Sequence, residues 1–310
     1  MAYIAVVGAA NVDIGGFPFG KAVAGDSNPG RVRMSMGGVG RNIACNAARM
    51  GLNAELVTAL GGDAYAGLIR QDCARAGVGL SRAQLFSEEA TSTYLFIADG
   101  QGDMTLAVND MGIHDRMTVE RLKPEMDWLN GASLAVIDAN LPEATCAFLA
   151  EHLTVPVLAD AVSAAKVERL RPALPHLDAF KPNRIEAELL TGIAVADEGS
   201  ARAAAEAILD MGVRRVFLTL GVHGVCCAEA GRTLFLPGVT LPMKNATGAG
   251  DAFTAALAWA RLRELSLEES ALAGMAAASI AVESLETVSG EMSEALLCRR
   301  MKEICEKMGG

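Results

Sequence analysis

A short segment near the end of the chain places small residues and one carboxylate directly before an apolar run; it reads NATGAGDAF (245–253). The run that follows is typical of a buried helix. The first N–H groups of a helix have no partner inside it, and the helix dipole adds partial positive charge there. Gly248, Ala249 and Gly250 leave these groups open to an anion such as a phosphate. Asp251 either takes part in chemistry or caps the helix, which aspartate does well.

A second set of polar side chains follows the first apolar run of the chain. YIAVVG (3–8) predicts a strand buried on both faces, and Asn11 and Asp13 come directly after it. Ligands of open parallel sheets bind beyond the carboxyl ends of the strands. An amide and a carboxylate at that place can bind a vicinal diol, since one donates and both accept hydrogen bonds. The alternative is an Asx turn that closes the strand.

Two glycine-rich segments predict close approach of a ligand to the backbone. GGVGRN (37–42) adds the amide of Asn42 in a first helical turn, but it matches neither a P-loop nor a complete dinucleotide fingerprint. A tight strand-to-helix turn is the alternative for this segment. In TLGVHG (219–224), Gly221 and Gly224 leave room at the end of a predicted strand for the phosphate or ribose of a nucleotide. The small-residue segment LAGMAAAS (272–279) either flanks a flat base or allows close helix packing.

A candidate metal ligand lies past mid-chain in KPNRIEAE (181–188). Asn183 and Glu186 are three residues apart, so they share one face of a helix. An amide and a carboxylate in that relation can hold water around Mg²⁺, which usually keeps several waters. The alternative is a capping box, with Asn183 as the cap and Glu186 at the third helical position.

Apolar runs and helical patterns alternate along the chain and predict a parallel sheet covered on both faces. The strand-like runs are 3–8, 54–60, 133–138, 155–160, 177–182 and 215–221, and the helical patterns are 40–51, 63–77, 183–192 and 200–212. Two turn-rich segments, approximately 14–36 and 91–111, interrupt this order. The second predicts a hairpin with its turn around Gln101, and together the two segments predict a small sheet that forms a lid. No linker divides residues 1–310, so we expect one domain.

Composition excludes several classes of function. The 310 residues carry a formal net charge of −10, which argues against a nucleic-acid surface. The seven cysteines are odd in number and form no C-x-x-C pair, which indicates reduced thiols. The longest apolar stretch, 271–282, is shorter than the ~18 residues of a membrane-spanning helix, and no export signal is evident. We therefore expect a cytoplasmic protein with no membrane or nucleic-acid partner.

Taken in order, these motifs resemble the ribokinase-like (PfkB) family of carbohydrate and nucleoside kinases over nearly the whole chain. The resemblance rests on Asn11-Val-Asp13, GGVGRN, PNRIE and TGAGDAF. It implies a three-layer α/β/α core with a mostly parallel central sheet and a small β-sheet lid. It also implies that Asp251 is the catalytic base, and that the backbone of Gly248, Ala249 and Gly250 stabilises charge on the phosphoryl group.

Within that family the chain looks like the pseudouridine kinases, through DSNPG (26–30), GGVGRNIA, VND (108–110), VSAAK (162–166) and KPNRIEAE. The likeness implies transfer of phosphate from ATP to the 5′-hydroxyl of free pseudouridine. The ribose would be held by Asn11, Asp13, Gly38, Val39, Gly40, Asn42 and Asn140. The base would be read by Ser27, Thr93, Asn109 and Lys166. The nucleotide would lie along Asn183, Thr219, Gly221, Gly224, Thr247, Gly248, Gly250 and Ala277.

The likeness further implies Mg²⁺ held by Glu186 through water, and a homodimer formed through the lid. One departure concerns a monovalent cation. Asn245 stands where the family commonly has an aspartate beside a cation loop, so the use of K⁺ stays open. Two alternatives to pseudouridine phosphorylation also stay open: a kinase for another nucleoside or a furanose sugar such as ribose, and a nucleoside sensor without catalysis.

Overall fold

The computed structural model describes residues 2–99, 104–239 and 243–309. Within these residues the large sheet has nine strands, in the order β15-β14-β13-β12-β11-β10-β1-β4-β6. The strands are β1 (Ile4–Val7), β4 (Ala54–Val57), β6 (Val78–Gly79), β10 (Leu134–Asp138), β11 (Val157–Asp160), β12 (Ala179–Lys181), β13 (Arg215–Thr219), β14 (Gly224–Glu229) and β15 (Arg232–Pro237). Only the edge pairs β13–β14 and β14–β15 are antiparallel. The predicted mostly parallel sheet is confirmed.

Helices cover both faces of this sheet. The α-helices are α1 (Val39–Arg49), α2 (Ala64–Ala76), α3 (Val119–Leu122), α4 (Met126–Asn130), α5 (Glu143–His152), α6 (Arg184–Thr191), α7 (Glu198–Asp210), α8 (Ala249–Arg261), α9 (Leu267–Val282) and α10 (Glu294–Gly309), and the 3₁₀ turns are Gly112–Arg116, Lys123–Glu125, Val167–His176 and Gly221–His223. Side chains alternate along a strand. Ile4 and Val6 accordingly pack into one hydrophobic core, and Ala5 and Val7 into the other. The predicted three-layer α/β/α core is confirmed.

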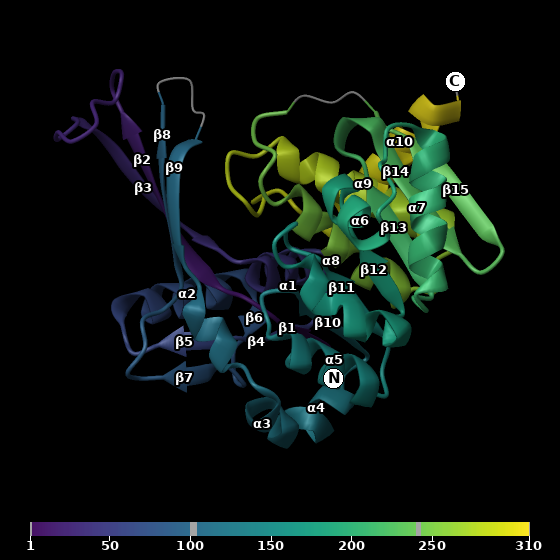
Figure 1. Cartoon of the computed structure of the whole chain (residues 1–310), viewed down its shortest axis with the longest axis horizontal. Coiled ribbons are helices and arrows are strands. Elements are labelled where there is room, and N and C mark those ends of the chain that lie inside the picture. The colour runs from purple at the N-terminus through teal and green to yellow at the C-terminus, as the bar shows by residue number, and fades with distance from the viewer. Residues whose placement is uncertain (1, 100–103, 240–242, 310) are drawn as a thin grey trace.

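A smaller sheet forms the predicted lid. Its strands are β2 (Asn11–Pro18), β3 (Gly30–Gly37), β8 (Thr93–Ala98) and β9 (Met104–Asp110), in the order β3-β2-β8-β9. Figure 1 shows this sheet projecting from the α/β core. β8 and β9 pair antiparallel as the hairpin pattern predicts, whereas the predicted turn at 100–103 lies outside the described residues.

One face of the lid sheet is apolar and exposed. Strand register aligns Met34, Ile14, Leu95 and Val108 in one row across the four strands. The next row toward the tip contains Val32, Gly16, Ile97 and Leu106. Val32 is 76% exposed and Leu106 is 61% exposed. The opposite face carries Asp13, aligned with Tyr94 and then with Asn109.

The structure departs from the sequence prediction at 54–60. The apolar run is divided at Thr58 into β4, which pairs with β1, and β5 (Ala59–Gly61), which pairs with β7 (Gln84–Phe86) in a separate two-stranded sheet. Hydrophobicity alone does not reveal such a change of partner. All seven cysteines are free. Over the described ranges we find no helix with the length and hydrophobicity needed to cross a membrane.

Candidate active site

Helix α8 begins with bare backbone, as the sequence predicts. Its N-cap residue is Gly248, at a left-handed φ of 86°, and a Cβ there would lie 2.1 Å from the carbonyl oxygen of Thr287. A glycine is therefore required. Asp251 is the third helical residue and not the N-cap. Its Oδ2 accepts a hydrogen bond of 2.7 Å from Asn42 Nδ2, which joins the start of α8 to the start of α1.

The Asp251 carboxyl lies in an environment that resists ionisation. Burial is the largest influence, and the neighbouring Asp160 carboxylate adds to it, so the pKa of Asp251 rises to about 7. The hydrogen bond from Asn42 and the Lys181 ammonium oppose this rise. A carboxyl group with a pKa near neutrality is suited to general base catalysis, because its basicity is high while it is still partly ionised.

Three charged residues near Asp251 were missed by the sequence interpretation. Asp138, Asp160 and Lys181 are the last residues of β10, β11 and β12. Lys181 Nζ lies 3.1 Å from Asp160 Oδ2, and Thr254 Oγ1 in α8 donates to the same oxygen at 2.6 Å. The available signal was a charged residue at the end of each apolar run, since buried charges are rare unless paired.

The residues predicted to bind a diol lie together at the start of β2. Asn11 Nδ2 donates to Asp13 Oδ1 at 2.6 Å. Burial raises the pKa of Asp13, against the opposing effects of that hydrogen bond and of Arg41. A Cβ on Gly37 would lie 2.3 Å from Asp13 Oδ2, and Gly38 has a φ of 97°. The 37–42 segment is thus a tight strand-to-helix turn that also leaves the carboxylate space.

Arg41 is a further residue that the sequence interpretation missed. This buried side chain donates to the carbonyl of Met36 and, at 2.7 Å, to Asn42 Oδ1, and it forms an ion pair with Asp72. Because the side-chain oxygen of Asn42 accepts this hydrogen bond from Arg41, the side-chain nitrogen of Asn42 is directed toward Asp251. Gly40 and Val39 belong to the same helical start, and a Cβ at Gly40 would lie 2.8 Å from the Gly8 backbone.

Asn140 and Lys166 are brought together by the structure. Lys166 Nζ donates to Asn140 Oδ1, and the backbone N–H of Asn140 donates to Asp138. Burial lowers the pKa of Lys166. The loop before it contains Val162 at a φ of 65°, an unfavourable conformation for a β-branched residue. Strained backbone of this kind concentrates at functional sites.

The lid residues predicted to read a base are not gathered around one point. Asn109 is exposed, on the lid face that carries Asp13. Ser27 is also exposed, in the loop between β2 and β3. Thr93 pairs with Val12 and therefore lies on the other face of the sheet. The structure brings only Asn109 onto the Asp13 face.

Three of the eight residues predicted for the nucleotide lie at the carboxyl ends of β12 and β13. Asn183, Thr219 and Gly221 line a cavity of about 630 Å³. Gly224 lies beside it at a φ of 112°, where a Cβ would be 2.1 Å from the Leu236 carbonyl oxygen. Thr247 precedes α8, and its N–H donates to Asn245 Oδ1. Ala277 is fully buried in α9 and does not line this cavity.

The fit to metal ions differs between the two predicted sites. Asn183 and Glu186 form a complete capping box, in which Glu186 Oε2 accepts from Asn183 N–H at 2.7 Å. Across the described residues, no three His, Cys, Asp or Glu side chains cluster to bind a metal directly. A single buried carboxylate fits Mg²⁺ held mainly by phosphate and water. Asn245 offers only an amide, whose oxygen already accepts from Thr247, so the carboxylate of a K⁺ loop is missing.

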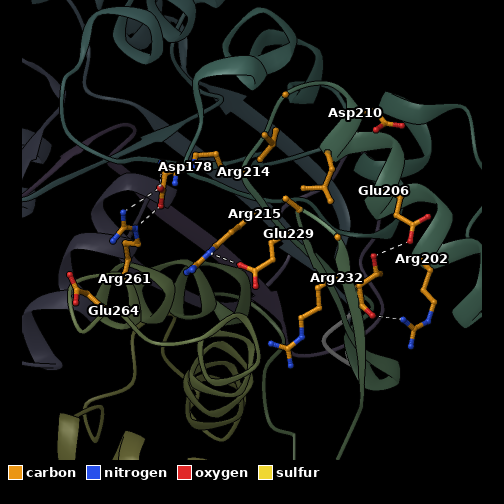
Figure 2. Close-up of a pocket in the computed structure, with 16 residues that line it drawn as sticks. Asp178, Arg202, Glu206, Asp210, Arg214, Arg215, Glu229, Arg232, Arg261 and Glu264 are labelled. Atoms are coloured by element: carbon orange, nitrogen blue, oxygen red, sulfur yellow. Dashed lines mark hydrogen bonds and ion pairs between the residues drawn. The ribbon is translucent and has the colours of Figure 1, made fainter.

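A wider cavity, of about 1270 Å³, lies at the amino end of β13 (Figure 2). Two of its arginines pair with carboxylates of the same lining: Arg261 lies 2.7 Å from Asp178, and Arg215 lies 3.2 Å from Glu229. These arginines are neutralised by carboxylates, and none of the residues predicted for chemistry lines the cavity. The candidate active site is therefore at the carboxyl ends of the strands, where Asp251, Asn42 and Lys181 meet.

Comparison with known proteins agrees with this fold. The pfkB family of carbohydrate kinases matches residues 1–294. A pseudouridine kinase of Escherichia coli (strain K12) is 35% identical over 83% of this chain and 82% of its own length. A ribokinase of Haemophilus influenzae is 29% identical over 81% of this chain and 82% of its own length.

A solved structure of Arabidopsis thaliana ribokinase, complexed with ribose and ATP, superposes with a TM-score of 0.87 at 22% identity, covering 97% of this chain and 99% of that one. At this identity the likeness concerns the fold alone. The match to the pfkB family places the chain among phosphotransferases that act on hydroxyl groups. The chain belongs to the pfkB family, as a sugar or nucleoside kinase.

The buried Asp251 carboxylate should reduce stability at neutral pH. Its folded-state pKa is raised to about 7, from an unfolded value of about 3.9. Its stabilising contribution is therefore present at low pH and is lost as the pH rises through about 7. We expect Asp251→Asn to raise the free energy of unfolding by at least about 1 kcal/mol at pH 8, with a smaller gain near pH 4.

Urea denaturation at both pH values measures this difference. Asp26→Asn, on the exposed loop between β2 and β3, is the matched control and should give no gain at either pH. Equal stability of wild type and Asp251→Asn at pH 8 would mean that the carboxylate is not desolvated.

Proposed function

We propose that this protein is an ATP-dependent kinase that phosphorylates the 5′-hydroxyl of free pseudouridine. The observation that carries the kinase assignment is the buried Asp251 carboxylate at the bare start of α8. The assignment to pseudouridine is supported by the 35% identity to a pseudouridine kinase and by the Lys166–Asn140 pair, which is joined to Asp138 at the end of β10. The presence of a carboxylate of raised pKa beside an anion-binding turn argues against a sensor, because binding alone does not require such a base.

In the proposed reaction Asp251 accepts the proton of the 5′-hydroxyl as its oxygen attacks the γ-phosphoryl group of ATP. The bond to ADP breaks as the new O–P bond forms. The N–H groups of Ala249 and Gly250, together with Gly248, stabilise the negative charge on the transferring group. Asn42 orients the Asp251 carboxylate through its 2.7 Å hydrogen bond. Phosphoryl transfer depends mainly on such positioning and charge stabilisation.

The remaining predicted residues divide into two groups around this centre. The ribose hydroxyls are held by Asn11 and Asp13, with Gly38, Val39, Gly40 and Asn140 shaping the pocket. The nucleotide is bound by Asn183, Thr219, Gly221, Gly224 and Thr247. Glu186 would hold Mg²⁺ through water, and the ion would supply further neutralisation of phosphate charge. Lid movement toward the core would bring Asn109 and Ser27 to the base and exclude water.

We expect a kcat/KM preference for pseudouridine over uridine of at least about tenfold, or ~1.4 kcal/mol. Pseudouridine carries a ring N1–H that uridine lacks, and a buried acceptor left without its donor is costly. Asn109→Ala should reduce this preference without abolishing turnover. Val108→Ala, which changes the opposite face of the same strand, is the matched control.

Measuring ADP release over a panel of nucleosides and sugars gives these ratios. Comparable rates on uridine, adenosine or free ribose would refute the assignment to pseudouridine, while the kinase assignment would stand. Absence of ADP release with every nucleoside and sugar would favour the sensor.

The catalytic assignment of Asp251 predicts a selective loss of turnover. Asp251→Asn should lower kcat by roughly 10²–10⁴-fold, the usual contribution of a positioned base. Nucleoside binding measured by calorimetry should stay nearly intact, because the ribose contacts are assigned to other side chains. Turnover close to wild type would reduce Asp251 to a structural residue.

We also propose that the protein is a homodimer formed through the lid. The exposed apolar rows of the lid sheet support this, since large exposed apolar patches usually mark interfaces. Sedimentation at micromolar concentration should give a dimer, and Leu106→Lys should shift it toward monomer. Leu285→Lys, at an exposed leucine outside the lid, should have no effect. A fully active wild-type monomer at this concentration would contradict the proposal.

A further inference from the structure

Three adjacent parallel strands end in a row of buried charges. Strand register aligns Asp138 with Asp160, and Asp160 with Lys181. These residues are only 1%, 2% and 6% exposed, respectively. The single cation of the row is held by Asp160, at 3.1 Å. A buried ion pair is costly to desolvate and contributes little net stability, so its presence calls for another reason.

The ion pair lies directly against the first turns of α8. Thr254 Oγ1 of that helix donates to Asp160 Oδ2 at 2.6 Å. A Cβ added to Gly250 would lie 3.0 Å from Lys181 Nζ, closer than side-chain atoms normally approach. Gly250 thus serves the site in a second way, since its missing side chain gives the ammonium room beside the helix backbone.

The charges that face Asp251 come from three strands. Asp138 and Asp160 are negative and disfavour the ionised Asp251, whereas Lys181 is positive and favours it; Asn42, from α1, adds an uncharged hydrogen bond. Burial lowers the pKa of Lys181, but Asp160, Glu186 and Asp251 raise it by more, and the net shift is upward. Lys181 therefore remains a fixed positive charge.

We propose that Lys181 is a positioning residue for phosphoryl transfer: held by Asp160, its ammonium keeps the Asp251 carboxylate ionised at the start of α8. This inference rests on the proposed role of Asp251 as the base. It gives Asp160 a definite role as well. The Asp160 carboxylate fixes the ammonium in place, and its own negative charge limits how far Lys181 can stabilise the neighbouring anion.

Removing the two charges one at a time should shift the titration of Asp251 in opposite directions. Lys181→Met removes the stabilising cation, so the acid limb of the kcat/KM profile should move to higher pH by about one unit or more. Asp160→Asn removes a repelling anion and leaves the cation uncompensated, so the limb should move to lower pH. Lys181→Arg keeps the charge and should leave the limb near its wild-type position.

The same shifts should be visible without any substrate. Carbon-13 NMR of labelled aspartate carboxyls, with Asp251→Asn to assign the signal, reports the Asp251 titration in the free protein. Lys123→Met, at an exposed lysine, is the matched control and should move neither measurement. If the NMR shifts occur but no nucleoside or sugar is phosphorylated, the proposed function fails and the charge coupling stands.

A variant with one unpaired buried charge can fail to fold, because breaking a buried pair is strongly destabilising. The double variant Lys181→Met/Asp160→Asn removes both charges, so it should fold and titrate within about half a unit of wild type. Single variants that lower the rate equally at every pH, or that shift the limb in the same direction, would overturn the proposal. The proposal would also be overturned if the acid limb of the double variant moved by about one pH unit or more, the shift expected of Lys181→Met alone.

Discussion

The arrangement of residues at the candidate active site depends on one carboxylate that is buried and must still ionise. Asp251 lies at the bare start of α8, where burial and two nearby aspartates raise its pKa. The helix start favours negative charge through its free N–H groups. Asn42 adds a hydrogen bond, and Arg41 fixes the orientation of that amide. The residues where α1, α8 and the strand ends meet thus act together on the ionisation of the Asp251 carboxylate.

The same constraint explains several glycines that otherwise look unrelated. Gly248 begins α8 because a side chain would meet the Thr287 carbonyl, and Gly250 leaves room for the Lys181 ammonium. Gly38 allows α1 to start close to the backbone of Ala10. Each glycine permits a close approach at a helix start that a side chain would block. Close packing at this point thus serves electrostatics as much as core formation.

Much of the fold could be predicted from sequence, because buried parallel strands and capped helices have strong local patterns. The lid hairpin was predicted from the alternation around its turn, and Asn183 and Glu186 are in the capping box that the sequence left open as an alternative. Lys181 and Asp160 could not be assigned, since their meaning depends on strand order, which the sequence does not state. Thr93 shows the same limit: only the register with Val12 reveals which face of the lid it occupies.

The charges around Asp251 determine how strong a base its carboxylate is. A carboxylate stabilised by Lys181 alone would ionise readily but would bind a proton weakly. One facing only Asp138 and Asp160 would be a stronger base but would be protonated at neutral pH. Burial, together with two anions, one cation and one amide, places the pKa near 7, where the product of ionised fraction and basicity is largest. Each member of the row at the strand ends therefore adjusts the base, and none can be removed without moving that balance.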